Sequence, residues 1–429
     1  MKYLITLLIA FCTLTSIAQT KSNQTSPVLT EGIAAEEGMS EERLARIDAM
    51  CIEAVRDGDI PGVVALVARN GKIVYHKAFG FADNVSKRNM KVDDIFRIAS
   101  QTKAITATAV MMLWEEGMFR LDDPISKYIP EFENMEVLDS LIEKDTTYLA
   151  TPVDKKITIR HLITHTSGIG YGVIDGDERI RKIYDKAGMT DLFTTKGTKI
   201  EDVVKKLAKL PLHHNPGEDF TYSLGLDVLG YFIEVVSGMP LDEFFRTRIF
   251  DPLGMDDTWF YLPESKYGRL VSVQEKKDEK WNKYPATFYD PDYPIKGEGS
   301  FFSGGAGLSS TAKDYATFLQ MYLNGGELNG VRILSRTTVQ AIMGNQIGDI
   351  WGDAGRYYGL AFAVINQKGQ DKGGQGSIGT FSWGGYFNTM YFADPQEQII
   401  GILMKQTQGP VSDDTGWQFQ QLVWQAVDD

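Results

Sequence analysis

The stretch Ile98-Ala99-Ser100-Gln101-Thr102-Lys103-Ala104-Ile105-Thr106-Ala107 places a nucleophile three residues before a base. On an α-helix, residues at positions i and i+3 lie on the same face, so a helix that begins at Ser100 brings the Lys103 amine beside the Ser100 hydroxyl. Proton abstraction from a serine needs this arrangement. The first turn of a helix also stabilises an oxyanion through the helix dipole. Ser100 and Lys103 are therefore candidate catalytic residues, although this spacing alone is equally compatible with a structural role.

Apolar residues flank the pair on both sides and predict a helix that is buried all round. Phe96, Ile98 and Ala99 precede Ser100, and Ala104, Ile105, Ala107, Val110, Met111 and Leu113 follow it. A lysine at the start of such a helix is costly to bury in its charged form unless it has partners or loses its proton. These surroundings favour a functional interpretation of Lys103.

A second Ser-x-x-Lys sequence runs from Ser310 to Lys313 and has a more ordinary explanation. Ser309 or Ser310 is a typical N-cap for a helix whose first turn, with Lys313 and Asp314, faces water. We therefore expect no catalytic role for this second pair.

The composition limits the class of protein. The chain has 429 residues, of which 43% are hydrophobic, and a formal net charge of -13 at pH 7. One catalytic unit with two lobes accounts for a chain of this length. The negative charge argues against nucleic acid or an anionic membrane surface as a partner, because both attract basic patches.

The N-terminus predicts export. Residues 1–18 contain Lys2, an apolar run and small residues before a cleavage site, as in a signal peptide. The apolar run is too short to span a membrane comfortably, so we expect no stable membrane insertion after signal removal. The mature protein is then periplasmic or secreted, with Cys51 as its one cysteine and no internal disulfide. Residues 19–38 lack an apolar period and predict a disordered tether.

The catalytic domain is predicted at residues 39–429, and its first elements are a helix and a hairpin. Ser40 is a typical N-cap for a helix whose apolar residues recur from Leu44 to Val55. Asn70-Gly71 joins two β-rich runs and is a strong hairpin signal, because both turn positions need a positive φ.

Strand-like sequence returns near the C-terminus, at residues 360–365, 381–383, 390–393 and 399–405, before a final helix at 417–427. We predict a mixed α/β (α+β) fold in which both ends of the chain form one antiparallel sheet, flanked by the terminal helices. The sheet lobe would comprise about 39–99 and 330–429, and a mainly helical lobe about 100–329.

Two further stretches are candidates for a site. Tyr222 follows a turn-rich segment, and a tyrosine held near a cation such as Lys103 can act as a base; the alternative is an ordinary core or surface tyrosine. Trp383-Gly384-Gly385 places glycines at a strand end, where a substrate can reach backbone N–H groups; the alternative is a β-bulge.

Metal and cofactor signals are weak. His161 and His165 stand four residues apart, as two zinc ligands on a helix would, but no third ligand is apparent and we favour structural roles for both. The sequence contains no Gly-x-Ser-x-Gly elbow, Walker A loop or dinucleotide fingerprint. We expect neither a metal nor an organic cofactor.

The order of the candidate stretches along the chain is informative. Ser100-x-x-Lys103, Tyr222-Ser223 and Trp383-Gly384-Gly385 resemble the motifs of serine β-lactamases and penicillin-recognising enzymes, and the class C branch in particular. Supporting stretches lie at 161–168, 216–223 and 304–310. The similarity covers nearly everything from about residue 40 onward and implies a class C β-lactamase-like fold.

The resemblance also implies a mechanism. Ser100 would attack a carbonyl and form an acyl-enzyme, and Lys103 and Tyr222 would handle its proton. The N–H groups of Ser100 and Tyr386 would form the oxyanion hole. Which of Lys103 and Tyr222 is the base remains open at this point, because the two groups titrate together.

Two departures from the family pattern bear on the substrate. Leu224 stands where the tyrosine motif usually ends in Asn, and Trp383 stands where Lys or His usually precedes the glycine. An indole cannot pair with a carboxylate as a cation does. With Gly384 and Gly385, these residues are expected to bind the substrate. The sequence looks most like the Trp-Gly-Gly esterases of family VIII type.

We therefore predict a serine hydrolase that acts on small uncharged acyl esters. A β-lactamase or a D-amino-acid peptidase, such as a D-alanyl carboxypeptidase, is the alternative, and a catalytically idle protein that binds cell-wall fragments is a further one. The partner is a small-molecule ester or amide. The loops at 168–197 and 284–302 are expected at the cleft entrance, and the oligomeric state stays open.

Overall fold

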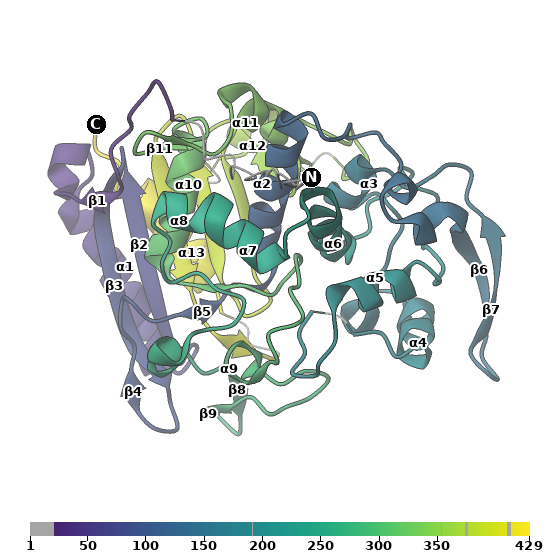
Figure 1. Cartoon of the computed structure of the whole chain (residues 1–429). Coiled ribbons are helices and arrows are strands. Elements are labelled where there is room, and N and C mark those ends of the chain that lie inside the picture. The colour runs from purple at the N-terminus through teal and green to yellow at the C-terminus, as the bar shows by residue number, and fades with distance from the viewer. Residues whose placement is uncertain (1–20, 191, 353, 374–375, 410–412) are drawn as a thin grey trace, which may run out of the picture.

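The computed structural model describes residues 21–190, 192–352, 354–373, 376–409 and 413–429. Its main sheet consists of β1 (Thr30–Glu31), β2 (Gly62–Arg69), β3 (Lys72–Asp83), β4 (Arg88–Asn89), β13 (Arg356–Tyr358), β14 (Ala363–Ile365), β15 (Phe381–Gly384), β16 (Met390–Asp394) and β17 (Ile399–Met404). The order is β1-β3-β2-β17-β16-β15-β14-β13, with β4 paired to β3. The strands from both ends of the chain thus lie side by side, as predicted (Figure 1).

Helices cover both faces of this sheet (Figure 1). They are α1 (Glu41–Arg56), α2 (Thr102–Glu115), α3 (Ile159–Ile163), α4 (Glu178–Lys186), α5 (Ile200–Leu207), α6 (Gly225–Ser237), α7 (Leu241–Phe245), α8 (Asp251–Leu253), α9 (Tyr293–Lys296), α10 (Ala312–Leu323), α11 (Arg336–Met343), α12 (Gln367–Asp371) and α13 (Thr415–Trp424). The terminal helices α1 and α13 pack together on one face.

Short strand pairs lie outside the main sheet. They are β5 (Phe96–Arg97) with β10 (Ser309–Ser310), β6 (Glu136–Ile142) with β7 (Thr147–Pro152), β11 (Glu327–Leu328) with β12 (Val331–Arg332), and β8 (Gln274–Lys277) with β9 (Lys280–Lys283) and β18 (Thr407–Gln408). In the described ranges no helix is both long and apolar enough to cross a membrane.

The N-terminal predictions from local sequence are confirmed. The Ser40 side chain caps α1 by accepting a hydrogen bond from the Arg43 N–H. Asn70 and Gly71 have φ values of 52° and 78°, as a tight turn between β2 and β3 requires. The even-numbered residues of β2 face the main core, and the odd-numbered residues face α1 and α13. β2 is consequently buried on both faces.

The segment that we predict as a disordered tether is instead ordered from residue 21. β1 pairs parallel with β3, and Leu29 and Ala34 are buried with 6% and 4% of their surface exposed. The Ser26 N–H donates to the Glu327 carboxylate. These are isolated contacts, with β3 at the edge of the main sheet and with β11, rather than a continuous apolar face, which explains why the sequence shows no apolar period. The predicted signal peptide and residues 19–20 lie outside the described residues.

The second Ser-x-x-Lys sequence is structural, but the predicted cap is wrong. Thr311 caps α10 by accepting from the Asp314 N–H, while Ser309 and Ser310 form β10. Lys313 faces water, whereas Asp314 is buried. α10 packs against β17 and β2, so the sheet lobe includes this helix in addition to the residues that we predict for it.

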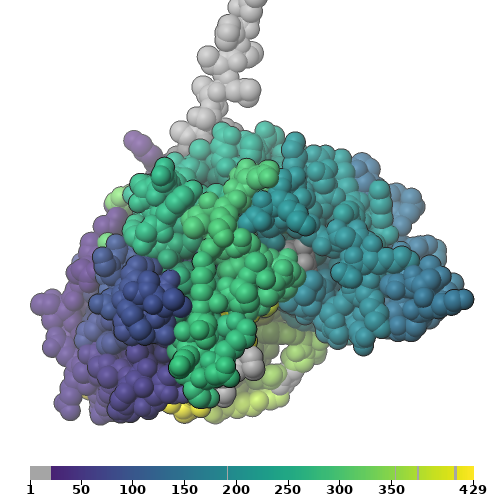
Figure 2. Space-filling view, turned by 90° about the horizontal axis from the view of Figure 1, so that it is seen from below, coloured from purple at the N-terminus to yellow at the C-terminus, as the bar shows by residue number. Residues whose placement is uncertain are grey.

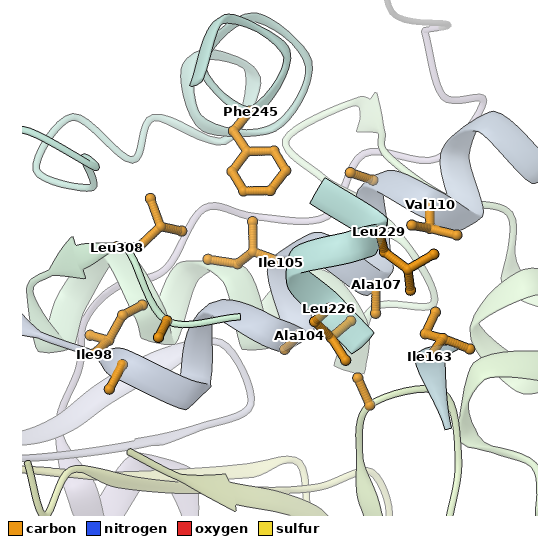
Figure 3. Close-up of a cluster of buried hydrophobic side chains, with 14 of the residues drawn as sticks. Ile98, Ala104, Ile105, Ala107, Val110, Ile163, Leu226, Leu229, Phe245 and Leu308 are labelled. Carbon is orange, nitrogen blue, oxygen red and sulfur yellow. The ribbon is translucent and has the colours of Figure 1, made fainter. Parts of the chain in front are cut away.

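α2 lies at the centre of the main core. Every residue from Thr102 to Leu113 is buried. Figure 3 shows Ala104, Ile105 and Ala107 of α2 against Leu226 and Leu229 of α6. The predicted burial of this helix on all sides is confirmed. Its close packing against α6 holds in place the two helices that lie beside the candidate site.

Candidate active site

Ser100 lies in a short 3₁₀ turn, Ala99–Gln101, that leads directly into α2. Ala99 has a φ of 42°, a conformation that costs a non-glycine residue about 1–3 kcal/mol and clusters at functional sites. Ile98 and Ala99 are fully buried, whereas Ser100 is partly exposed. The turn therefore brings the Ser100 hydroxyl from the core to the surface.

Lys103 is buried beneath Ser100 with 1% of its surface exposed. Its Nζ lies 3.3 Å from Ser100 Oγ, 3.0 Å from Tyr171 Oη and 2.8 Å from the Gly305 carbonyl oxygen. Three partners satisfy the three N–H groups of an ammonium. The spacing that the sequence predicts thus places an amine within proton-transfer reach of the nucleophile.

The ring of Tyr222 also lies against Lys103. Lys103 Nζ is 4.6 Å from the centroid of the Tyr222 ring, a cation–π contact. The Tyr222 ring stacks on Tyr171, and its Oη accepts a hydrogen bond of 3.3 Å from Trp383 Nε1. The structure therefore brings Ser100, Lys103, Tyr222 and Trp383 together from four separate parts of the sequence.

The Trp383-Gly384-Gly385 stretch ends β15 without a bulge, because Trp383 and Gly384 pair regularly with β16. A Cβ atom on Gly385 would lie 2.5 Å from the Ile98 carbonyl oxygen, so this strand end is in contact with the turn that carries Ser100. Tyr386 follows, and its carbonyl accepts from Gln408 Nε2. The oxyanion hole of Ser100 and Tyr386 N–H groups remains a prediction with this placement.

Leu224 differs from its predicted role. Its side chain belongs to the main core with 2% of its surface exposed, which does not favour direct contact with substrate. The preceding Ser223 is also buried and its Oγ is 3.0 Å from His165 Nδ1. This part of the motif fixes the start of α6 and the backbone beside Tyr222.

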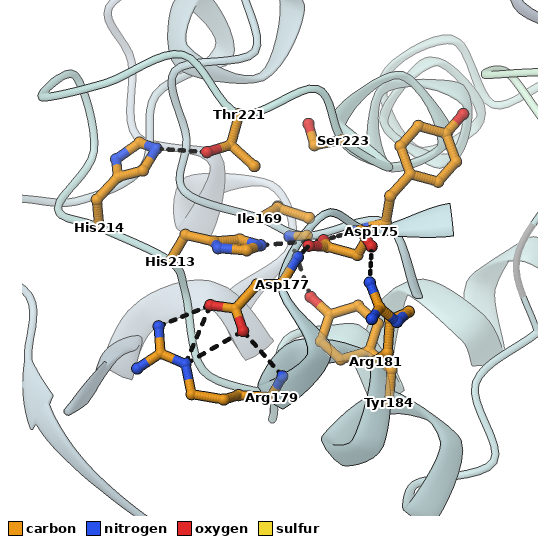
Figure 4. Close-up of polar contacts among 12 residues, drawn as sticks. Ile169, Asp175, Asp177, Arg179, Arg181, Tyr184, His213, His214, Thr221 and Ser223 are labelled. Carbon is orange, nitrogen blue, oxygen red and sulfur yellow. Dashed lines mark hydrogen bonds and ion pairs between the residues drawn. The ribbon is translucent and has the colours of Figure 1, made fainter. Parts of the chain in front are cut away.

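Sequence reasoning missed Tyr171, which lies just after the 161–168 stretch. Its N–H donates to Asp175 Oδ2, which is also 3.0 Å from His213 Nε2 (Figure 4). Burial raises the pKa of Asp175, but hydrogen bonds from His213 and from the Asp177 and Tyr171 N–H groups outweigh it and lower the pKa. An ionised Asp175 thus holds the loop that presents Tyr171 to Lys103.

Tyr171→Phe should lower kcat/KM for an ester about tenfold, because Lys103 loses one of three partners while Ser100 Oγ and Gly305 O remain. Steady-state rates and thermal unfolding would be measured for this variant and for Tyr322→Phe. The control removes a buried hydroxyl that contacts Thr108, further along α2. Equal losses in both variants would show that Tyr171 has only a structural role.

The two histidines have structural roles, as we predict, but they do not form a pair. His161 Nδ1 accepts from the Thr158 N–H and closes the cap of α3. His165 lies beyond α3, fully buried, and burial followed by the positive charge of Lys103 lowers its pKa well below the usual value. Among the described residues, no cluster of His, Cys, Asp and Glu could hold a metal ion.

Comparisons with known proteins agree with this geometry. The profile of the Beta-lactamase family matches residues 47–423. Esterase EstB of Burkholderia gladioli is 31% identical over 382 residues, which cover 85% of this chain and 90% of EstB. Lovastatin esterase of Penicillium rubens is 28% identical over 384 residues, covering 84% of this chain and 92% of its own.

Solved structures show the same relationship. EstCE1, described as a hydrolase with promiscuous acyltransferase activity, superposes with a TM-score of 0.75 at 27% identity, over 89% of this chain and 99% of its own. The match of the family profile extends from α1 to α13 and includes all the site residues. The chain therefore belongs to the beta-lactamase family.

Proposed function

We propose that this protein is a carboxylesterase that hydrolyses small uncharged acyl esters through an acyl-enzyme on Ser100. The contact between Trp383 and Tyr222 carries this proposal. The single N–H of the indole is donated to Tyr222 Oη, so Trp383 has no second donor for a substrate carboxylate. The esterase relatives support the same assignment.

The proposed reaction assigns a role to each of these polar groups. Ser100 Oγ attacks the ester carbonyl, and its proton passes to the pair of Lys103 and Tyr222. The oxyanion forms beside the N–H groups of Ser100 and Tyr386. Collapse breaks the bond to the alcohol, which leaves with a proton. Water then attacks the carbonyl carbon of the acyl group with the help of the same residues, the bond to Ser100 Oγ breaks, and the acid is released.

Aromatic side chains surround Trp383 and make this side of the site apolar. Its ring lies 5.7 Å from Tyr222, 5.5 Å from Tyr358 and 6.3 Å from Trp351, measured between centroids. Burial of an apolar alkyl or aryl group against such a surface stabilises the complex by roughly 25 cal/mol per Å². An ester without charge gains this energy and leaves no charged group unpaired.

A cavity of about 480 Å³ lies between the two loops that we expect at the cleft entrance, although Tyr386 itself is not part of its lining. Phe193 and Tyr289 line it, and their ring centroids lie 6.5 and 6.3 Å from that of Tyr386. Figure 2 shows a hollow on this face, where the teal, green and yellow-green parts of the chain meet. The volume suits a small substrate group.

The test is a side-by-side assay of a chromogenic butyrate ester and a chromogenic cephalosporin, with Ser100→Ala as control. We expect the unchanged protein to hydrolyse the ester, and we expect Ser100→Ala to lower the rate of ester hydrolysis at least about 10³-fold. Efficient cephalosporin turnover with negligible ester hydrolysis would instead assign a β-lactamase. Lack of labelling of Ser100 by a fluorophosphonate would favour the idle binding protein.

A further inference from the structure

Asp227 is a carboxyl group in the main core close to Lys103. It lies in the first turn of α6, with 3% of its surface exposed. Its neighbours along α6, Leu226 and Leu229, pack on the apolar residues of α2 (Figure 3). A buried carboxyl group is unfavourable without compensating hydrogen bonds or an opposite charge, so its presence here calls for a physical account.

The hydrogen bonds of Asp227 lead to Lys103 through one residue. Asp227 Oδ1 accepts from Ser303 Oγ at 2.5 Å and from the Gly305 N–H at 3.3 Å. The carbonyl of the same Gly305 accepts from Lys103 Nζ at 2.8 Å. Thr106 Oγ1 of α2 binds the Gly304 carbonyl at 2.6 Å. The 303–305 segment is thus held between α6 and α2.

Among the residues that the structure describes, the second oxygen of Asp227 has no hydrogen-bond partner, and it is buried away from solvent. It lies directly beside Gly305, since a Cβ atom on that residue would be 2.3 Å from Asp227 Oδ2. Only glycine fits here, and the carboxylate is in contact with the peptide that binds Lys103. This oxygen can therefore act on Lys103 through its charge.

Asp227 is the carboxyl group that the described contacts place near Lys103. Burial raises the pKa of Asp227 above its usual value, and the Ser303 hydrogen bond and then the positive charge of Lys103 oppose this rise without cancelling it. Burial and the same positive charge keep His165 neutral. The remaining polar groups at Lys103 Nζ are the hydroxyls of Ser100 and Tyr171, and Tyr222 presents its ring face.

We propose that Asp227 is a positioning residue for Lys103: it holds the 303–305 segment so that the Gly305 carbonyl orients the amine, and its carboxylate places a negative charge beside the peptide that binds this amine. The inference deepens the proposed function, on which it rests for the role of Lys103 in acylation. It does not depend on which ester is the natural substrate.

The test measures how fast a fluorophosphonate labels Ser100 as a function of pH. In this reaction Ser100 Oγ attacks phosphorus, the P–F bond breaks, fluoride leaves and the serine proton passes to the base. Asp227→Asn keeps the shape and an acceptor for Ser303 but removes the charge. The acidic limb of the pH–rate profile should move to lower pH by about one unit, because the site loses a negative charge.

Asp314→Asn is the matched control. Asp314 is another buried carboxyl group with two hydrogen-bond donors, the Asp257 N–H and Thr258 Oγ1, and burial raises its pKa to about 6. It lies in α10, and its hydrogen bonds lead to residues 257 and 258 rather than to Lys103. The profile of this variant should coincide with that of the unchanged protein.

Ser303→Ala keeps the inference testable if Asp227→Asn does not fold. Loss of this hydrogen bond makes the carboxyl group harder to ionise, so the same limb should move in the same direction by a smaller amount. If Asp227→Asn folds and its pH–rate profile is not shifted, the inference is wrong while the proposed function stands. If only Ser303→Ala folds, an unshifted profile of that variant has the same meaning. Absence of labelling in the unchanged protein would overturn the proposed function, and this inference with it.

Discussion

Lys103→Met should lower the rate of Ser100 acylation about 10³-fold. Methionine keeps the length of the side chain and fills the buried space, but it cannot take a proton from Ser100 Oγ, now 3.3 Å from the amine. The Gly305 carbonyl and Tyr171 Oη lose the same partner. We therefore also expect the free energy of unfolding to fall by about 1–3 kcal/mol. Stopped-flow acylation with a p-nitrophenyl ester, alongside thermal unfolding, separates the two effects.

The second Ser-x-x-Lys sequence provides a control within the same chain. Lys313 follows Ser310 at the same spacing, but its side chain is exposed. Lys313→Met should acylate at the rate of the unchanged protein to within about twofold, as most surface substitutions away from a site do. An acylation rate of folded Lys103→Met within tenfold of the unchanged protein would show that Lys103 does not take the serine proton.

Gly385→Ala should lower kcat by at least about 100-fold, comparable to the loss of one oxyanion-hole donor. The new Cβ atom would lie 2.3 Å from Thr389 Oγ1 and 2.5 Å from the Ile98 carbonyl oxygen. The threonine side chain can rotate, but Ile98 cannot move without shifting the turn that carries Ser100. The strand end and the nucleophile would move apart, and the oxyanion hole that they are expected to form would open.

Gly384→Ala is the neighbouring comparison. Its nearest atom to a new Cβ is the Thr389 carbonyl oxygen at 3.2 Å, a contact that a shift of a few tenths of an ångström relieves. We expect a loss of less than about tenfold, in KM rather than in kcat. Equal effects of both substitutions on kcat, or a kcat for Gly385→Ala near that of the unchanged protein, would contradict the assigned position of the oxyanion hole.

The parts of the site that follow from local sequence could be predicted. The contact between Ser100 and Lys103 depends only on i and i+3 positions at a helix start, and the hairpin turn at Asn70-Gly71 depends only on the φ values of two residues. Burial of α2 followed from its apolar residues. These predictions need no knowledge of the rest of the chain.

The partners of Lys103 could not be predicted in this way. Tyr171, Gly305 and Asp227 come from three segments that meet only when the core is packed, and nothing in their spacing relates them to Lys103. The positive φ of Ala99 is equally hidden, because alanine rarely adopts it and the surrounding contacts impose it. Local sequence made Tyr222 and Trp383 candidates with ordinary structural alternatives, and the family resemblance gave them their expected roles; their hydrogen bond to each other could not be predicted.

The order of the strands also determines when the protein can fold. β2 is apolar on both faces and pairs with β17, which follows it in the chain only after the helical lobe. Until β17 is available, the β2–β3 hairpin has an open apolar edge that can pair with other chains. β15, which contacts the Ser100 turn, is added through β16 and β17. The active site is therefore completed only once β17 is in place, and a chain truncated before β17 should aggregate rather than form a partly active enzyme.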